Sequence, residues 1–257
     1  MERNSKELTV KGKVIDGQSP AICLPLIGTN EEELIRELKT IVAQEPDLIE
    51  WRGDFFEKLD EEAKVMDALL KIKDLAGEIP ILFTIRSVTE GGEPIPLNEE
   101  AKVHLLTRLI ETGKIELVDY ELHNESRYIE HLREVTRSHD VKLMVSYHNF
   151  EQTPPLESLF EKGEQAEQYE ADLVKFAVMP DDMKDVLVVL EATHSLDSYL
   201  RIPVVAISMG GNGSISRMFG WRFGSMITFA VGHQSSAPGQ IPLEDLRTVV
   251  GIIKKSL

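Results

Sequence analysis

Asp172-Leu173-Val174-Lys175-Phe176-Ala177-Val178 is an apolar, β-branched run of strand length that one lysine interrupts. The residues on either side of it predict amphipathic helices, over Leu156–Tyr169 and Met183–Ser195. A buried strand between two helices is the repeating unit of a parallel sheet with right-handed crossovers. The fold class therefore depends on how often this unit recurs along the chain.

The unit recurs along nearly the whole sequence. Further strand-like runs are Ala21–Ile27, Asp47–Arg52, Pro80–Arg86, Ile115–Leu122, Lys142–His148, Pro203–Met209 and Met226–Val231. Further helical patterns are Glu31–Ala43, Glu61–Leu75, Glu99–Thr112 and Ser126–Ser138, with a last helix over Pro242–Lys255. Eight strand-like runs alternating with helical patterns in 257 residues predict an α/β fold, a (β/α)8 TIM barrel. An open doubly wound sheet is the alternative, but it normally has a glycine-rich turn after its first strand, and Leu26-Ile27-Gly28-Thr29-Asn30 is not one.

A short segment before the first strand predicts a separate feature. Leu8–Ile15 alternates between apolar and polar residues around Gly12, which indicates a β-hairpin covering one mouth of the barrel. No linker or low-complexity tract suggests a second domain. We therefore expect residues 1–257 to form a single catalytic barrel domain.

Composition limits the partners of this domain. Charged residues make up 28% and hydrophobic residues 42%, which is typical of a globular enzyme. The net charge of −16 argues against binding to nucleic acid or to an anionic membrane. The N-terminal segment Met1–Lys6 lacks the apolar core of a signal peptide, so we expect a cytoplasmic protein. Cys23, the single cysteine, allows no intrachain disulfide and is expected to be a small buried side chain.

Polar side chains gather at the C-terminal ends of the predicted strands, where barrel enzymes carry their chemistry. Lys175 is the strongest catalytic candidate among them, because an ammonium buried without a partner is costly and often loses its proton. A neutral amine in an apolar site can form a Schiff base with a ketone or aldehyde. The alternative is that Lys175 reaches the strand end and pairs with Asp172 or Glu170.

Two arginines at the strand ends suggest an anion-binding site. Arg52 and Arg86 can hold a carboxylate, and their positive potential is expected to favour the free amine of Lys175. Each has an alternative. Glu50 and Arg52 share a strand face and can form a structural salt bridge, while Arg86 can simply be solvated.

The remaining strand ends suggest proton transfer rather than metal chemistry. His148 suits acid–base catalysis, with a hydrogen-bonded core histidine as the alternative. Asp119 and Glu121 are expected to position other side chains, and Met209 ends the seventh strand. The seven histidines show no metal-ligand spacing, so no metal site is expected.

Two loops after the last strands complete the predicted mouth. The glycine-rich stretch Ser208–Arg217 suggests either a phosphate site or a mobile loop that delivers Arg217. The segment Gly232–Gln240 is polar and long for a connection, and we interpret it as a lid.

The residues at these strand ends resemble those of the type I 3-dehydroquinate dehydratase family over essentially the whole chain. The matching segments are Glu50-Trp51-Arg52-Gly53-Asp54, Phe83-Thr84-Ile85-Arg86 with Glu90-Gly91-Gly92-Glu93, Asp119-Tyr120-Glu121, Ser146-Tyr147-His148-Asn149-Phe150, Val174-Lys175, Ile207-Ser208-Met209-Gly210, Ile215-Ser216-Arg217 and Ser236-Ala237-Pro238-Gly239-Gln240. The resemblance implies a homodimeric barrel that dehydrates 3-dehydroquinate to 3-dehydroshikimate without a cofactor, through a lysine imine.

The resemblance also implies a role for each matching position. Lys175 would be the Schiff-base residue, His148 the proton-transfer residue and Glu90 its acidic partner. The implied substrate-binding set is Glu50, Arg52, Arg86, Met209, Arg217, Ser236 and Gln240. Two positions depart from the family: Pro25 stands where a serine is common, and Gly211-Asn212-Gly213 differs from the more familiar lysine-threonine-glycine.

Two other functions fit the same pattern of residues. Another imine-forming barrel, such as a class I aldolase or transaldolase, would usually bind a sugar phosphate, whereas Arg217 with Gln240 suits a carboxylate better. A catalytically silent barrel used as a binding module would be expected to lack Lys175 or His148, and both are present.

Overall fold

The computed structural model describes residues 6–257, so most of the segment Met1–Lys6 lies outside the described residues. Its main sheet has eight parallel strands, ordered β10-β3-β4-β5-β6-β7-β8-β9. A parallel bridge between Val204 and Ser225, with a 2.8 Å bond from the Met226 amide to the Val204 carbonyl, joins β9 to β10 and closes the ring. The strands are β3 (Ala21–Leu26), β4 (Leu48–Arg52), β5 (Ile81–Thr84), β6 (Leu117–Glu121), β7 (Lys142–Asn149), β8 (Leu173–Val178), β9 (Val204–Ser208) and β10 (Ile227–Phe229).

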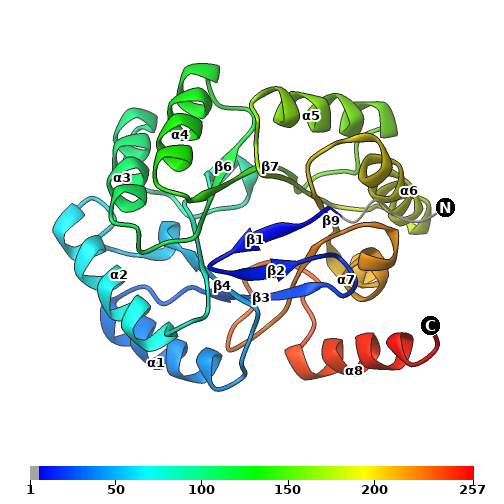
Figure 1. Cartoon of the computed structure of the whole chain (residues 1–257), viewed down its shortest axis with the longest axis horizontal. Coiled ribbons are helices and arrows are strands. Elements are labelled where there is room, and N and C mark those ends of the chain that lie inside the picture. The colour runs from blue at the N-terminus through cyan, green and yellow to red at the C-terminus, as the bar shows by residue number, and fades with distance from the viewer. Residues whose placement is uncertain (1–5) are drawn as a thin grey trace.

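The helices surround this ring on its outside (Figure 1). They are α1 (Glu31–Val42), α2 (Glu62–Ala76), α3 (Glu99–Glu111), α4 (Ser126–Ser138), α5 (Leu156–Gln168), α6 (Met183–Tyr199), α7 (Gly210–Phe223) and α8 (Leu243–Lys254). Two short 3-10 helices, η1 (Gly53–Phe55) and η2 (Val88–Glu90), follow β4 and β5. The predicted (β/α)8 barrel is confirmed.

The region after β9 differs from the sequence-based expectation. The glycine-rich stretch is not a mobile loop, because α7 begins at Gly210 and contains Arg217. A side chain at Gly213 would put a Cβ 2.2 Å from the Ser208 carbonyl oxygen, so only glycine allows the helix to start this close to the strand. The Ser216 hydroxyl fixes the same turn by accepting from the Ser208 amide at 2.8 Å and donating to the Gly213 carbonyl at 2.7 Å.

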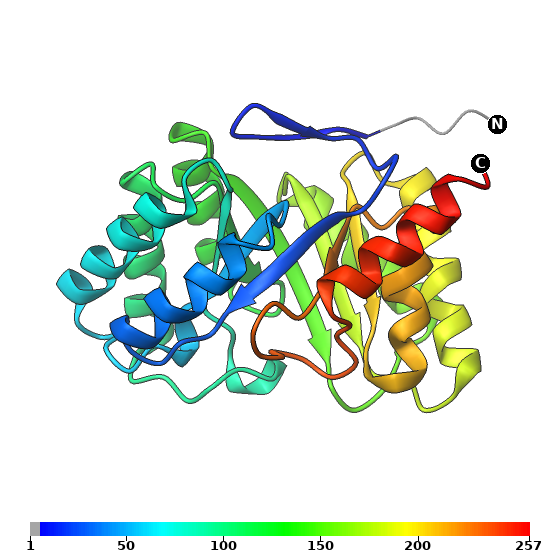
Figure 2. The ribbon, with the colours of Figure 1, turned by 90° about the horizontal axis from the view of Figure 1, so that it is seen from below.

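The predicted hairpin is present and lies across one end of the barrel (Figure 2). Its strands are β1 (Leu8–Val10) and β2 (Lys13–Ile15), paired antiparallel. Leu8 and Val10 join the apolar cluster that fills the interior, which also contains Ala21, Cys23, Leu48, Leu82, Leu117, Met144, Leu173, Val205 and Ile227. The hairpin therefore covers the mouth at the N-terminal ends of the strands, opposite the predicted chemistry.

Every second side chain of a strand points into the barrel, and this decides which residues fill the interior between the apolar cluster and the C-terminal mouth. Successive inward positions on one strand are two residues apart, and in-register strands stack them in layers. Leu117 of β6 lies in the apolar layer, whereas Asp119 and Glu121 point inward above it and are buried. The barrel is thus apolar toward the hairpin and polar toward the C-terminal mouth.

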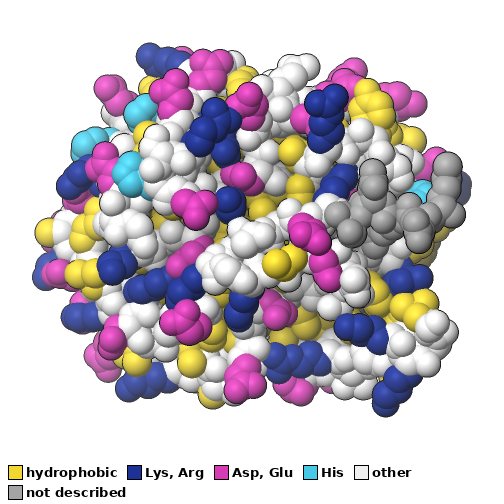
Figure 3. Space-filling model, viewed as in Figure 1, with side chains coloured by type: hydrophobic (Ala, Val, Ile, Leu, Met, Phe, Trp, Pro, Cys, Tyr) yellow, Lys and Arg dark blue, Asp and Glu magenta, His cyan; other side chains and the backbone are white. Residues whose placement is uncertain are grey.

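The surface and the helices agree with the composition. Acidic and basic side chains are interspersed over the face that carries the hairpin (Figure 3). Within residues 6–257, none of the helices has both the length and the apolar character needed to cross a membrane. Cys23 is fully buried, as predicted, and burial raises the pKa of its thiol well above the usual value.

Candidate active site

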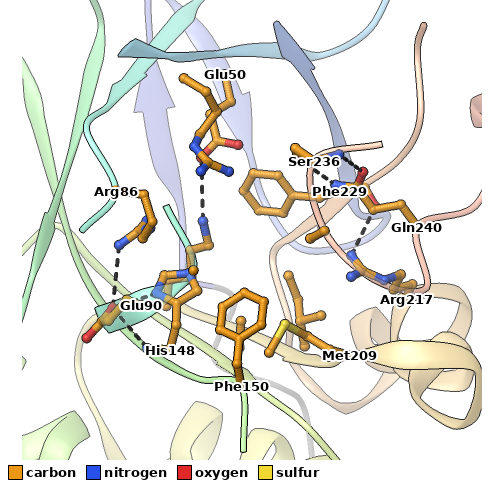
Figure 4. Close-up of a pocket in the computed structure, with 16 residues that line it drawn as sticks. Glu50, Arg86, Glu90, His148, Phe150, Met209, Arg217, Phe229, Ser236 and Gln240 are labelled. Atoms are coloured by element: carbon orange, nitrogen blue, oxygen red, sulfur yellow. Dashed lines mark hydrogen bonds and ion pairs between the residues drawn. The ribbon is translucent and has the colours of Figure 1, made fainter. Parts of the chain in front are cut away.

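A pocket that encloses about 460 Å³ of space, part of it open to solvent, lies at the C-terminal mouth of the barrel. Figure 4 shows that its lining comes from many strands and from the segment after β10. Every side chain predicted for the site lines it. The lining residues are Glu50, Arg52, Arg86, Glu90, Gly91, His148, Phe150, Lys175, Ala177, Ile207, Met209, Arg217, Phe229, Ser236, Ala237 and Gln240.

Lys175 lies deep in this cavity. Its side chain is 6% exposed, and its Nζ lies 3.4 Å from Asp119 Oδ2 and 3.6 Å from Glu50 Oε1. The nearest charged groups are therefore carboxylates rather than the arginines expected from the sequence. The alternative pairing with Asp172 or Glu170 is wrong, because those carboxylates bind Arg133 and Arg137 on the outside of the barrel.

His148 is held by a buried carboxylate. Its Nδ1 lies 2.8 Å from Glu90 Oε2, and its backbone amide donates to the same oxygen at 3.1 Å. An ionised carboxylate only accepts, so Nδ1 carries the hydrogen and Nε2 of the neutral ring is free to take a proton. Burial, followed by the charges of Arg86 and Lys175, lowers the pKa of His148 well below its usual value.

Glu90 reaches this position through a tight turn. The amides of Glu90 and Gly92 both donate to the Ser87 carbonyl, at 3.0 and 2.8 Å. Gly91 has a φ of +83°, and a Cβ there would lie 2.3 Å from the Phe150 ring. Burial raises the pKa of Glu90, although hydrogen bonds and the Arg86 charge oppose that shift.

The alternative interpretation of Arg86, a solvated side chain at the strand end, is wrong. Arg86 is 3% exposed, and its guanidinium contacts Asp119 Oδ2 at 2.7 Å and Glu121 Oε1 at 3.3 Å. Its Nη1 also lies 3.6 Å from Glu90 Oε2. Burial raises the pKa of Asp119, but the charges of Arg86 and Lys175 together with the hydrogen bonds from Ser146 and Arg86 outweigh it and hold that pKa below the usual value. Asp119 thus positions Arg86 and Lys175, and Glu121 positions Arg86, in line with the role expected of them.

Glu50 and Arg52 do not form the salt bridge offered as their alternative. Arg52 instead makes a bidentate pair with Asp54, at 2.9 Å through Nε and 2.7 Å through Nη2. Glu50 Oε1 accepts from the Thr84 hydroxyl at 3.0 Å and faces Lys175.

Arg217 differs from the other two arginines of the cavity. Its guanidinium donates to the carbonyl oxygens of Phe229 at 3.2 Å and Pro238 at 3.0 Å, and within residues 6–257 its buried Nε has no hydrogen-bond partner. Burial lowers its pKa to about 10, so it is charged at neutral pH. A buried cation without a carboxylate partner is suited to an anionic ligand.

The segment Gly232–Gln240 supplies the rim beside Arg217. Gln240 Oε1 accepts from the Ser236 amide at 2.9 Å, and Gln240 Nε2 donates to the Ser236 hydroxyl at 3.2 Å. Both residues line the cavity, as the sequence predicted. The prediction that this segment moves as a lid concerns dynamics and stays a prediction.

Sequence reasoning missed two aromatic rings in the lining. The centroid of the Phe229 ring lies 4.3 Å from Lys175 Nζ, a cation–π contact. Strand alternation could have identified Phe229, which lies inside the predicted run Met226–Val231. Phe150 follows β7 in a loop, where periodicity gives no signal. Pro25 of β3 lies in register with Glu50 and is not among the lining residues.

Metal ligands are not grouped in the described part of the chain. Among residues 6–257, no three histidine, cysteine, aspartate or glutamate side chains are arranged to hold a metal ion. The fold and the site together define a class of protein: a (β/α)8 barrel enzyme with a buried lysine and a histidine–carboxylate pair at the C-terminal mouth.

Comparison with known proteins identifies the family within this class. A family model for type I 3-dehydroquinase matches residues 22–256. The 3-dehydroquinate dehydratase of Albidiferax ferrireducens is 48% identical over 256 residues, covering 99% of this chain and 97% of the relative. That of a Geobacillus species is 46% identical over 257 residues, covering 100% and 99%. The crystal structure of the Geobacillus kaustophilus enzyme matches with a TM-score of 0.96 at 46% identity, covering 99% of both chains.

The chain belongs to the type I 3-dehydroquinase family. Enzymes of this family dehydrate 3-dehydroquinate in the shikimate pathway. The match extends over essentially the whole of each relative, so the barrel described above corresponds to their full length.

Proposed function

We propose that this chain dehydrates 3-dehydroquinate to 3-dehydroshikimate through a Schiff base on Lys175, with His148 moving the protons. The observation that carries the proposal is that the buried amine of Lys175 and the Glu90-bound ring of His148 face one cavity. Family membership supplies the substrate, and the geometry supplies the groups for the chemistry.

The proposed reaction begins when the Lys175 ammonium passes a proton to His148 and the free amine attacks the substrate's C3 ketone. His148 returns that proton to the carbinolamine oxygen, which leaves as water, and a protonated imine remains. The imine withdraws electrons and acidifies the C2 hydrogen, which Nε2 of His148 removes to give an enamine. The enamine's electron pair then expels the C1 hydroxyl, which leaves as water with the proton from His148. Hydrolysis of the conjugated imine frees the lysine. One histidine serves as base and then as acid because the two transfers are sequential.

Glu90 supports both of these transfers. Its carboxylate fixes the tautomer of His148 with Nδ1 protonated, and it stabilises the imidazolium that forms when Nε2 takes the C2 proton. Burial strengthens this interaction, because few water dipoles screen it.

The same cavity suggests how the substrate is oriented. We assign the substrate carboxylate to Arg217, the arginine of the lining whose charge is not already paired with a carboxylate. Ser236 and Gln240 border Arg217 and can hydrogen-bond substrate oxygens. Met209 provides an apolar contact, whereas Glu50, Arg52 and Arg86 complete the polar wall. Holding the carboxylate at one end orients the C2 hydrogen toward His148.

The decisive experiment combines turnover with trapping. Purified protein mixed with 3-dehydroquinate should produce the ultraviolet absorbance of the conjugated enone. Borohydride added with substrate or product should inactivate the enzyme, and peptide mapping should find the adduct on Lys175. Lys175→Ala should abolish trapping, whereas Lys184→Ala, at an exposed position on α6, should leave it intact. An adduct on any other lysine would falsify the assignment.

The family resemblance also supports two finer proposals. We propose that the chain acts as a homodimer and that its compartment is the cytoplasm. Light scattering after size exclusion should give twice the 28.9 kDa mass of the chain, and a monomeric active species would contradict the first of these.

A further inference from the structure

Glu90 is shared by two histidines rather than one. Its Oε2 binds His148 inside the cavity, while its Oε1 lies 3.0 Å from Nδ1 of His123. The His123 side chain is 46% exposed, whereas those of Glu90 and His148 are 5% and 8% exposed. A hydrogen-bonded chain therefore runs from a solvent-accessible imidazole, through a buried carboxylate, to the ring proposed to move protons.

Both rings must donate to this carboxylate from Nδ1. Each histidine therefore keeps Nε2 free, so His123 can gain or lose a proton at Nε2 without breaking its bond to Glu90. The bond persists in both states, but the charge beside Glu90 changes.

The backbone around His123 is fixed by hydrogen bonds to residues of the strands that carry the cavity. His123 lies in the turn after β6, where the Leu122 amide donates to the Ser146 carbonyl at 2.8 Å and the Asn124 amide donates to the Glu121 carbonyl at 3.3 Å. The Glu121 carboxylate also accepts from the Ser87 amide at 2.7 Å, at the start of the turn that carries Glu90. The two segments that bring His123 and Glu90 together are thus tied to one residue.

We propose that His123 is a positioning residue for the dehydration: it fixes the Glu90 carboxylate against His148, and its charge state sets how strongly Glu90 supports the His148 imidazolium. The proposal rests on the proton-transfer role proposed for His148. His123 does not line the cavity, so its effect on the substrate passes through Glu90.

The charges around His123 determine the direction of the effect. The hydrogen bond to Glu90 raises its pKa above the usual value, burial opposes this, Glu121 adds to the rise and Lys102 counteracts it. A charged His123 partly neutralises Glu90, so the carboxylate stabilises the His148 imidazolium less and His148 becomes a weaker base. Turnover should therefore increase as pH rises through the pKa of His123, because the neutral ring keeps its hydrogen bond but no longer offsets the negative charge of Glu90.

Two substitutions separate the hydrogen bond from the charge. His123→Phe removes both, whereas His123→Gln keeps an N–H donor without a titrating proton. His139→Phe is the matched control, because His139 is an exposed histidine whose Nδ1 contacts the Val135 carbonyl on the outside of the barrel. Both kcat and KM for 3-dehydroquinate are measured from pH 6 to 9, per folded molecule and below the Tm of each variant.

His123→Phe should lower kcat about tenfold, the size of one hydrogen bond to a charged group. Its KM should stay within about twofold of the wild-type value, because His123 does not touch the substrate. His123→Gln should keep kcat within about threefold at alkaline pH and should lose the wild-type increase in kcat with pH. His139→Phe should match the wild type throughout.

Several results would overturn the proposal. If His123→Phe has the same kcat as the wild type, whether or not its Tm is lower, His123 has no positioning role in the reaction. A pH profile of His123→Gln that keeps the wild-type rise would assign that rise to another group. His148→Ala, assayed in parallel, separates this failure from failure of the proposed function. If His148→Ala is inactive while His123→Phe is normal, only the role of His123 is lost; if His148→Ala keeps its turnover, the proton-transfer assignment and this proposal fail together.

Discussion

Replacing Lys175 with methionine tests the ionic contacts of this residue together with its chemistry. The two side chains are similar in length, so the variant loses the ammonium without opening a large cavity. The lost charge lies 3.6 Å from Glu50 and 3.4 Å from Asp119. Asp119 keeps Arg86 as its cation at 2.7 Å, whereas the partner of Glu50 that remains in the described residues is the Thr84 hydroxyl. The variant therefore leaves Glu50 as a buried carboxylate without a cation.

The expected cost follows from that environment. Removing one member of a buried ion pair destabilises a protein by about 3–5 kcal/mol. In a chain of this size each kcal/mol lowers Tm by about 2–4 °C, so Lys175→Met should lower it by about 6–20 °C. Adding Glu50→Gln replaces the uncompensated carboxylate with a neutral amide. The double variant should therefore recover most of the lost Tm, although neither variant regains the amine.

Thermal unfolding, borohydride trapping and enone absorbance measured on the same samples distinguish the two effects. Lys175→Met should be folded, less stable, inactive and resistant to trapping, and the double variant should be stable and still inactive. An unchanged Tm in Lys175→Met would refute the electrostatic reasoning. Measurable turnover in either variant would refute covalent catalysis at this lysine.

Three further predictions concern pH, backbone packing and metals. Burial and the Arg86 charge depress the pKa of His148, so the unfolded chain binds that proton more tightly and stability should fall as pH drops below about 6.5. The free energy of unfolding, measured with denaturant and plotted against pH, should rise more steeply in the wild type than in His148→Asn, by up to ~1.4 kcal/mol per pH unit. Equal slopes in the two proteins would argue against this role of His148. Gly213→Ala should lower Tm because its Cβ would meet the Ser208 oxygen at 2.2 Å, whereas a Cβ at Gly211 has nothing within 4 Å; equal effects of the two alanines would remove the packing explanation. Chelators should leave activity unchanged, and activity that is lost in EDTA and restored by a divalent ion would overturn the imine mechanism.

The barrel and the residues of its cavity were predictable because each strand carries a local signal. Apolar β-branched runs identified the strands, and polar residues at their C-terminal ends identified one mouth of the barrel. Glu50, His148 and Lys175 therefore line one cavity, as the sequence predicted. Helix α7 was not predictable in the same way, because glycines have low helix propensity, and the need for Gly213 comes from its contact with Ser208.

The partners of the charged side chains were harder to predict than their positions. Lys175 faces Asp119 and Glu50 across the barrel interior, while sequence proximity suggested Asp172 and Glu170. Such pairs depend on register and barrel closure, which bring together residues that are far apart in sequence. His123 was missed for a similar reason, since a half-exposed histidine in a turn resembles an ordinary surface residue until Glu90 is placed beside it.

The hairpin at the far end of the barrel has a kinetic consequence. Among residues 6–257, Leu8, Val10 and the apolar cluster above them fill the interior from that end, so the cavity opens at the C-terminal mouth. Substrate must enter and product must leave by that route, past the same segment after β10. Product that occupies the cavity would block the next substrate, so on the proposed function we expect product inhibition to be competitive with 3-dehydroquinate.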